Sequence, residues 1–394
     1  MSSKFICLRS ARLAARHPCH RRAFASAASS RDAVRIVEVG PRDGLQNEKN
    51  AIPLATKIEL VERLARTGLK TIEAGSFVSP KWTPQMANSS EILEHVLRNT
   101  PQSPAPITYQ WLLPNVKGFD NFLKLWSAQS PTGQDAYPTP PPSPGPDGGP
   151  ALNTSSEDPN AMPSARSGAE AIGKERTSSS AGGPVHEISI FTAATESFTQ
   201  KNTNCSIEES LKRFEPIMSK AKEMDLKVRA YISVALGCPY EGPDVDPHKV
   251  AELAISLLEM GADEISVADT TGMGTAPKTA KLLKTLDAAG IDKHDLALHF
   301  HDTYGMALVN SVVALEHGIR TFDAAVGGLG GCPYSPGATG NVATEDLVHL
   351  FHSLGMATGV NMEELSEIGG WISAELGKSN ESSAGKATLA QMQK

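Results

Sequence analysis

The sequence predicts a (β/α)8 TIM barrel, in which eight parallel strands close into a ring and helices cover its outside. Short β-branched runs alternate with longer segments of helical periodicity, and this alternation indicates a parallel sheet. It repeats eight times between residues 31 and 378, as such a barrel requires. A doubly wound open sheet is the alternative fold, but no GxGxxG motif follows the first strand.

The elements can be placed by the spacing of apolar residues, which alternate or run together in strands and recur three or four apart in helices. We expect strands at residues 34–39, 71–74, 107–112, 187–191, 227–234, 264–267, 296–301 and 321–325. We expect helices at residues 54–66, 85–97, 116–126, 207–224, 248–260, 277–288, 306–317 and 344–354. A chain of 394 residues, 40% of them hydrophobic, is long enough for one such domain.

Three segments fall outside this alternation. Residues 127–184, between the third helix and the fourth strand, are rich in Pro, Gly, Ser and Thr and predict a disordered insertion. An insertion after a helix and before a strand lies on the face opposite the active-site loops of a barrel. A proline-rich docking or phosphorylation site is the alternative interpretation. Residues 362–378 are expected to form a short helical extension and 379–394 a flexible tail.

The first 30 residues are basic and contain no acidic side chain. The cations are Lys4, Arg9, Arg12, Arg16, Arg21 and Arg22. Arg-rich, acid-poor segments of this kind are typical of mitochondrial transit peptides. We therefore expect residues 1–30 to direct the protein to the mitochondrial matrix. A basic tail without a targeting role is the alternative.

Composition excludes several classes of function. The formal net charge of -7 argues against general nucleic-acid binding. No apolar run approaches the roughly 18 residues needed to cross a bilayer, so we expect no membrane partner. Three of the five cysteines lie after the predicted transit peptide, and they follow no CxxC pattern. They predict free thiols in a reducing compartment.

Two histidines at the end of the seventh predicted strand suggest a metal site. His299 and His301 are two residues apart, so their imidazoles face the same side of a strand. Asp43 follows the first strand and Asn341 the eighth, on the same rim of the barrel. Two nitrogen and two oxygen donors without thiolate predict a divalent cation such as Mg2+ or Mn2+. The alternatives are hydrogen-bonded core histidines, an Asx turn at Asp43 and a helix cap at Asn341.

Other polar residues on this rim are candidates for catalysis. Arg42 is always charged and suits the stabilisation of an oxyanion or enolate, although a surface salt bridge to Glu38 or Glu48 is possible. Glu73 ends an otherwise apolar strand and could pair with Arg42 or assist proton transfer. Cys332 lies in a glycine-rich loop that could close over the site, where its thiol could donate a proton.

Four further side chains are weaker candidates for binding the substrate. They are Lys49, Ser76, Ser266 and Asp269. Each follows or ends a predicted strand, or lies near its end. Lys49, Ser76 and Ser266 could bind a carboxylate or part of a coenzyme A chain, and Asp269 could bind another part of the substrate.

Five stretches of the sequence resemble the 3-hydroxy-3-methylglutaryl-CoA lyase family, which belongs to a superfamily of metal-dependent lyases and synthases. They are VGPRDGLQNE at 39–48, SFVSPKW at 76–82, ALGCPYEG at 235–242, HFHDTYG at 299–305 and GLGGCPY at 328–334. The Arg-Asp-Gly and His-Phe-His pieces occur across the superfamily, whereas the cysteine loop is more specific to the lyases. The resemblance extends from about residue 33 to 355, except for the insertion.

This resemblance implies cleavage of 3-hydroxy-3-methylglutaryl-CoA to acetyl-CoA and acetoacetate, as in leucine breakdown and ketone-body formation. In that family the residues matching the four predicted ligands bind the metal. The arginine matching Arg42 stabilises the enolate, and the cysteine matching Cys332 is implicated in protonating it. The general base stays open between His299, Asp43 and a metal-bound hydroxide, because His299 cannot be ligand and base at once. We also expect an acyl-CoA partner and a homodimer.

The departures from the family pattern are the insertion and residues Thr271 and Met306, none of which is a predicted ligand. Within the superfamily, the alternative function is a Claisen-condensing synthase, although such enzymes typically carry further domains after the barrel. From a different class, the alternative is a noncatalytic metal-binding scaffold that uses the proline-rich insertion.

Overall fold

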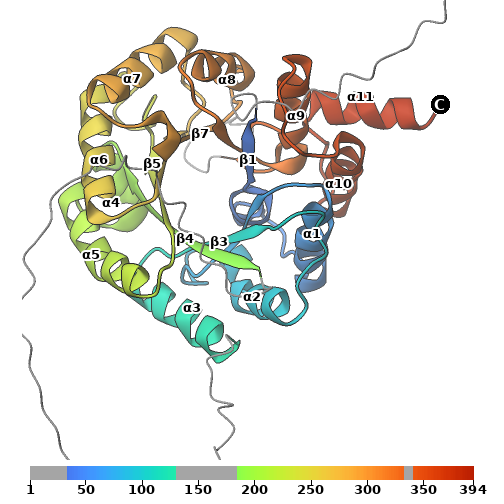
Figure 1. Ribbon diagram of the computed structural model, residues 1–394, viewed down its shortest axis with the longest axis horizontal. Coiled ribbons are helices and arrows are strands. Elements are labelled where there is room, and N and C mark those ends of the chain that lie inside the picture. Colours follow the sequence, from blue (N-terminus) through green and yellow to red (C-terminus); the bar gives the residue numbers. More distant parts are fainter. Residues whose placement is uncertain (1–32, 130–183, 332–339) are drawn as a thin grey trace, which may run out of the picture.

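The computed structural model describes residues 33–129, 184–331 and 340–394. Within these ranges, eight parallel strands follow one another around a closed barrel, and the first pairs with the last (Figure 1). The strands are β1 (Arg35–Glu38), β2 (Thr71–Ser76), β3 (Thr108–Leu112), β4 (Val185–Ala193), β5 (Val228–Ser233), β6 (Glu264–Asp269), β7 (Leu296–Phe300) and β8 (Thr321–Ala324). The predicted TIM barrel is confirmed.

Helices follow the strands and form a ring around the barrel (Figure 1). They are α1 (Leu54–Arg66), α2 (Ser89–Arg98), α3 (Val116–Gln129), α5 (Ile207–Glu223), α6 (Pro247–Met260), α7 (Ala276–Ala288), α8 (Ala307–Glu316) and α9 (Thr344–Ser353). Each matches a predicted helix to within a few residues. The predicted helix at 85–97 is the least accurate, because a 3-10 turn, η3 (Pro84–Met86), precedes α2.

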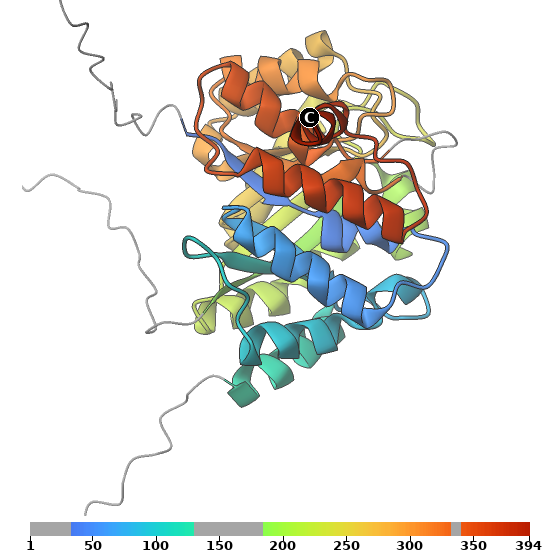
Figure 2. The same ribbon diagram turned by 90° about the vertical axis from the view of Figure 1, so that its right-hand side faces the viewer.

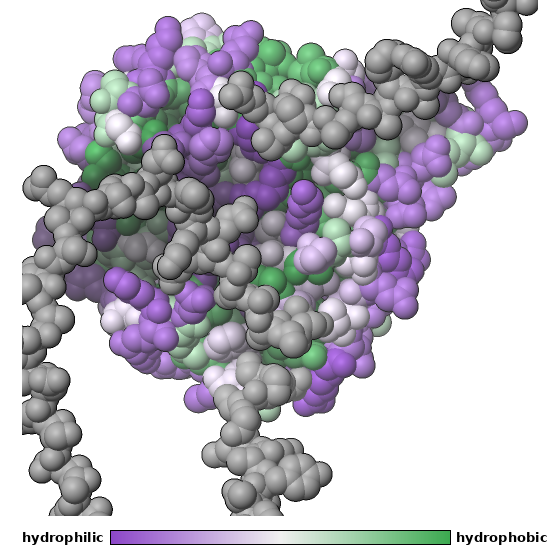
Figure 3. Space-filling model, in the orientation of Figure 1, coloured by the Kyte–Doolittle hydropathy of each residue, from purple (hydrophilic) through white to green (hydrophobic). Residues whose placement is uncertain are grey.

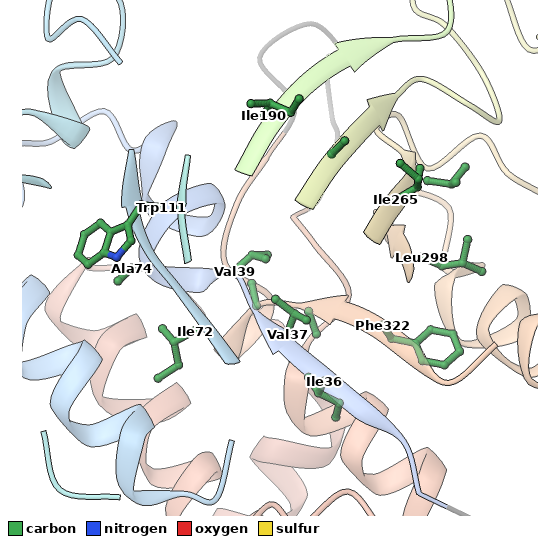
Figure 4. Packing of buried hydrophobic residues seen from close by; sticks show 14 of the residues in the cluster. Ile36, Val37, Val39, Ile72, Ala74, Trp111, Ile190, Ile265, Leu298 and Phe322 are labelled. Carbon is green, nitrogen blue, oxygen red and sulfur yellow. The ribbon is translucent and has the colours of Figure 1, made fainter. Parts of the chain in front are cut away.

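The main hydrophobic core lies between the strands and the surrounding helices. Figure 4 shows Ile72 and Phe322 extending from their strands toward this layer. The ring of Phe322 contacts that of Phe351 on α9, with centroids 5.1 Å apart, and both side chains are fully buried. Full burial of one such side chain contributes about 1.5–3 kcal/mol, so this layer supplies most of the stability of the barrel.

The helix that follows β4 was not expected from the sequence. α4 (Glu196–Thr203) lies between β4 and α5. Its sequence, ESFTQKNT, has one large apolar residue and two threonines, which are poor helix formers. The hydroxyl groups of Thr199 and Thr203 donate to the carbonyl groups four residues earlier, and Asn204 ends the helix in the left-handed conformation. Burial of Phe198 in a small cluster with Val234 and Cys238 therefore holds a helix that apolar periodicity does not predict.

The prediction for the end of the chain was partly wrong. The helical extension is present as α10 (Met362–Glu375), which packs on the outside of the barrel beside α1 (Figure 2). The expected flexible tail instead contains α11 (Ser383–Met392), which contacts α10. Ser382 caps this helix by accepting from the amide of Gly385, and its hydroxyl donates to Asp346 at 2.8 Å. The cap and this tertiary contact order a segment with little apolar periodicity.

The face on which the strands begin is the one turned toward the viewer in Figure 3, and hydrophilic residues cover much of it. α3 ends and β4 begins on this face, so the chain enters and leaves the predicted insertion there. Residues 127–129 of that prediction belong to α3, whereas 130–183 lie outside the described residues, as does the predicted transit peptide at 1–30. Among the described residues, no helix combines the length and apolar character needed to span a membrane.

Candidate active site and metal centre

Three side chains converge at the carboxyl ends of the strands. Asp43, His299 and His301 each place one potential ligand atom within 4.8 Å of the others. The Nε2 atoms of both histidines lie 3.9 Å from the same carboxylate oxygen, Oδ2 of Asp43. The histidine rings are tilted to one another, with centroids 5.3 Å apart. The spacing of two along the chain therefore brings both imidazoles to one point.

A π-helical turn positions Asp43. After β1 the chain forms η2 (Gly40–Gly44), in which the backbone amides of residues 42, 43 and 44 all donate to the carbonyl of Val39. The distances are 3.2, 2.7 and 3.1 Å. π-helical turns are rare and occur frequently at functional sites. This one places the side chains of Arg42 and Asp43 next to each other, so the guanidinium group donates to the Asp43 carboxylate at 2.6 Å.

Asn341 joins the cluster from the loop after β8, where its backbone pairs with His301. Its amide Nδ2 donates to Asp43 Oδ2 at 2.9 Å, while its buried Oδ1 has no hydrogen-bond partner. A half-turn of the amide would exchange these two atoms and present oxygen to a cation. Gly330 permits this approach, because a Cβ atom there would lie 2.7 Å from Asn341 Nδ2 and its φ of +123° disfavours other residues. The helix-cap alternative is wrong, since Ala343 precedes α9.

The protonation states at the cluster suit metal binding. Burial raises the pKa of Asp43, but the charges of Arg42 and the two histidines outweigh it and lower the pKa to about 2. Burial, together with the charge of His299, lowers the pKa of His301 to about 4. At neutral pH the site therefore offers an ionised carboxylate and a neutral imidazole, which are the forms that bind metals. With the orphaned amide oxygen of Asn341, these residues fit a divalent cation.

Arg42 links the cluster to a second carboxylate. Its Nε and Nη2 atoms lie 2.7 and 2.6 Å from Glu73 Oε2 on β2, and both side chains are buried. Glu73 also accepts from Ser189 at 2.7 Å and from the hydroxyl of Tyr231 at 3.0 Å. The guanidinium group lies over the Tyr231 ring, 5.4 Å from its centroid. The predicted pairing of Arg42 with Glu73 is confirmed, and the surface salt bridge to Glu38 or Glu48 is wrong.

Asp269 ends β6 beside the histidines. Its Oδ2 accepts from the amide of Gly274 at 2.9 Å, whereas its Oδ1 is buried without a partner. Burial raises its pKa to about 6, although that amide and the charge of His299 oppose the shift. Only glycine fits at 274, because a Cβ atom there would lie 2.6 Å from the carboxylate. Asp269 thus keeps one free oxygen that could bind a polar group.

The remaining predicted residues occupy different positions. Ser266 lies inside the barrel and donates to Asp323, one layer below the cluster. Ser76 ends β2, is buried, and accepts from the amide of Val78. Lys49 is exposed in the loop after η2. Cys332 falls in 332–339, outside the described residues, although Asn47 donates to the carbonyl of the preceding Gly331 at 2.7 Å.

Sequence reasoning missed the residues that fill the barrel below the cluster. Arg229 and Tyr231 on β5 and Asp323 on β8 are all buried inside it. Arg229 contacts Asp323 at 2.6 Å and packs against the Tyr231 ring, 5.1 Å from its centroid. The available signal was a polar residue in the middle of a strand with apolar neighbours, as at Asp323 in TFDA. These residues lie within strands, so grouping polar residues by strand ends does not find them.

The protein is an eight-stranded parallel barrel. A carboxylate, two imidazoles and a buried arginine lie at the carboxyl ends of its strands. This combination defines a barrel enzyme with a candidate metal centre.

Comparison with known proteins identifies the family. The family model described as HMGL-like matches residues 33–128 and 166–372. The chain is 44% identical to 3-hydroxy-3-isohexenylglutaryl-CoA/hydroxy-methylglutaryl-CoA lyase of Pseudomonas aeruginosa, over 91% of this chain and 98% of the relative. It is 43% identical to the mitochondrial hydroxymethylglutaryl-CoA lyase of Rattus norvegicus, over 90% and 89%. A crystal structure of hydroxymethylglutaryl-CoA lyase from Pseudomonas aeruginosa has a TM-score of 0.72 at 43% identity, covering 91% and 98%. The chain belongs to the HMGL-like family and is a carbon–carbon lyase.

Proposed function

We propose that this lyase cleaves 3-hydroxy-3-methylglutaryl-CoA to acetyl-CoA and acetoacetate. The observation that carries the proposal is the cluster of Asp43, His299 and His301 directly beside the buried guanidinium group of Arg42. A retro-Claisen cleavage needs a polarised tertiary alcohol and a stabilised thioester enolate, and this cluster offers one group of residues for each requirement.

The first requirement concerns the alcohol. Asp43, His299, His301 and the oxygen of Asn341 would hold Mg2+ or Mn2+, as their mixed nitrogen and oxygen donors favour. When bound, the cation supplies Lewis acidity to the hydroxyl and carboxylate oxygens of the substrate. Asp269 is proposed to bind a polar group of the substrate at the same rim, and its buried Oδ1 without a partner supports this role.

The second requirement concerns the enolate that forms when the C2–C3 bond breaks. Glu73 accepts from Nε and contacts Nη2 of Arg42, and Asp43 accepts from Nη1, so the guanidinium plane is fixed before substrate binds. Burial alone would lower the pKa of Arg42. The charges of Glu73 and Asp43 raise this pKa by more than burial lowers it, so the guanidinium group stays cationic. A fixed cation stabilises developing negative charge without reorganising. Cys332 is the proposed proton donor to C2, with Lys49 and Ser76 as weaker binding candidates, whereas Ser266 donates its hydroxyl to the buried Asp323 below the cluster.

We further propose an acyl-CoA partner bound as substrate, a homodimeric assembly and a location in the mitochondrial matrix. The basic, acid-poor residues 1–30 support this location, as does the mitochondrial name of the rat relative. The similarly identical relative from Pseudomonas aeruginosa is bacterial, so import of a labelled full chain into isolated mitochondria is the relevant test.

The activity can be tested with the purified chain and 3-hydroxy-3-methylglutaryl-CoA, after EDTA treatment and after adding back Mg2+ or Mn2+. We expect acetoacetate release that EDTA abolishes and either cation restores. Incubating acetyl-CoA with 2-oxo acids tests the condensing alternative in the same experiment. Metal binding without turnover in either direction would favour the noncatalytic scaffold and reject the lyase proposal.

A further inference from the structure

Asp323 contacts one of the two histidines from below. It lies on β8 inside the barrel and its carboxylate is fully buried. Oδ1 accepts from Nη2 of Arg229 at 2.6 Å, and Oδ2 accepts from the hydroxyl of Ser266 at 2.9 Å. The same Oδ2 lies 3.3 Å from Nδ1 of His299. Among the described residues, no other side chain forms a hydrogen bond or an ion pair with His299 Nδ1.

These contacts determine which nitrogen of His299 carries its proton. An ionised carboxylate can only accept hydrogen bonds, and the guanidinium group of Arg229 keeps Asp323 in that form. Nδ1 of His299 must then be the donor. The Nε2 atom, which points to Asp43, consequently keeps its lone pair in the neutral ring.

We propose that Asp323 is a positioning residue that fixes His299 as the Nδ1–H tautomer and so presents the Nε2 lone pair to the cation. The inference rests on the proposed metal site. It applies to His299 and not to His301, because His301 Nδ1 is buried without a partner among the described residues and no carboxylate fixes its tautomer. It assigns His299 to the ligands, so the general base has to be another group.

Metal affinity tests the proposal through Asp323→Asn. The asparagine amide can donate to Nδ1, which favours the tautomer whose Nε2 carries hydrogen and cannot bind metal. We expect the dissociation constant for Mn2+, measured by titration calorimetry on the full chain, to rise about 10- to 100-fold. Ser266→Ala is the matched control, because it removes one hydrogen bond to the same carboxylate without touching His299. It should change the constant by less than about threefold.

An unchanged Mn2+ constant in a folded Asp323→Asn variant would overturn the proposal, as would an equal loss in the Ser266→Ala control. Since Asp323→Asn leaves Arg229 without its buried partner, the variant could fail to fold. Long-range 1H–15N correlation spectra of the unsubstituted chain, labelled at histidine nitrogens and free of metal, then decide the question. We expect a Nδ1–H signal that His299→Gln removes, and a Nε2–H tautomer at that residue would contradict the proposal.

Neither measurement uses the acyl-CoA substrate. A chain with the Nδ1–H tautomer and tight Mn2+ binding that fails to cleave 3-hydroxy-3-methylglutaryl-CoA would refute the proposed function and leave this inference intact. If the unsubstituted chain cleaves the substrate but the Asp323→Asn variant binds Mn2+ normally, this inference is refuted and the proposed function stands.

Discussion

Along the strands of the barrel, apolar side chains that face the helices alternate with charged side chains that point into the barrel. Ile72 and Phe322 face the helices (Figure 4). Their neighbours Glu73 and Asp323 lie inside the barrel with arginine partners. Both sides of the barrel wall are fully buried. A barrel interior is usually filled by branched apolar residues, so the charged interior of this one needs an explanation other than packing.

The energetic cost of the two sides explains the difference. Burying apolar side chains is favourable, but a buried ion pair often stabilises a protein no more than apolar residues of the same volume would. Arg42 and Arg229 each lie between two carboxylates in the interior. The outer layer therefore accounts for stability, and the interior residues are explained by the geometry that they impose on the site.

Truncating the outer layer should give the largest change in stability and little change in chemistry. Phe351→Ala removes a fully buried ring that contacts Phe322, and we expect the free energy of unfolding to fall by about 3–5 kcal/mol. Urea unfolding measures this, with Leu354→Ala at a half-exposed position as the control. Turnover per folded molecule should stay near that of the unsubstituted chain. A loss of turnover larger than the loss of folded protein would contradict the division between the two sides.

Changing the interior should give the opposite result. Arg42→Gln removes the fixed cation beside the proposed enolate, and we expect kcat to fall about 10^2- to 10^3-fold, equivalent to roughly 3–4 kcal/mol. Circular dichroism should still show a folded barrel, because the outer layer is unchanged. Arg42→Lys is the comparison variant, since it keeps the charge but loses the paired contacts with Glu73. Near-normal turnover of Arg42→Gln would remove this residue from the mechanism.

This division also explains how much the sequence could predict. The outer layer follows apolar periodicity, so the strands and the surrounding helices were placed to within a few residues. The rim was predictable as well, because strand ends can be located and their polar residues grouped, as with Asp43 and His301. The interior was not, since Arg229 and Asp323 are distant in sequence and only closure of the barrel brings them together.

The local exceptions have the same kind of cause. The π-helical turn η2 depends on three amides that share the carbonyl of Val39, which apolar periodicity does not reveal. The helix α11 depends on a cap and on a contact with Asp346, which is distant in sequence. In both places, hydrogen bonds rather than hydrophobic spacing decide the backbone.

The pKa shifts of the buried acids depend on whether an arginine lies beside them, and we expect these shifts to have a smaller effect on stability. Burial raises the pKa of Glu345 to about 8 and that of Glu38 to about 7, although hydrogen bonds oppose each shift. Glu345 accepts from the amide of Gly327, and Glu38 accepts from the amides of Gly40 and Val326 and from the hydroxyl of Thr344. Asp43, beside Arg42, shows the opposite shift.

Stability should therefore decrease as the pH rises through the neutral range. Glu345 keeps its proton in the folded chain up to about pH 8 but loses it near 4.5 when exposed by unfolding, so rising pH favours the unfolded state. The stabilisation that the protonated Glu345 gives the folded state is complete below about pH 4.5 and is lost by about pH 8. We expect the Tm to be lower at pH 8.5 than at pH 6, and Glu345→Gln to reduce this difference, with Glu38 causing the remainder. Glu363→Gln, at an exposed position on α10, is the control. An identical pH dependence in Glu345→Gln and in the unsubstituted chain would show that backbone amides alone keep this buried carboxylate ionised.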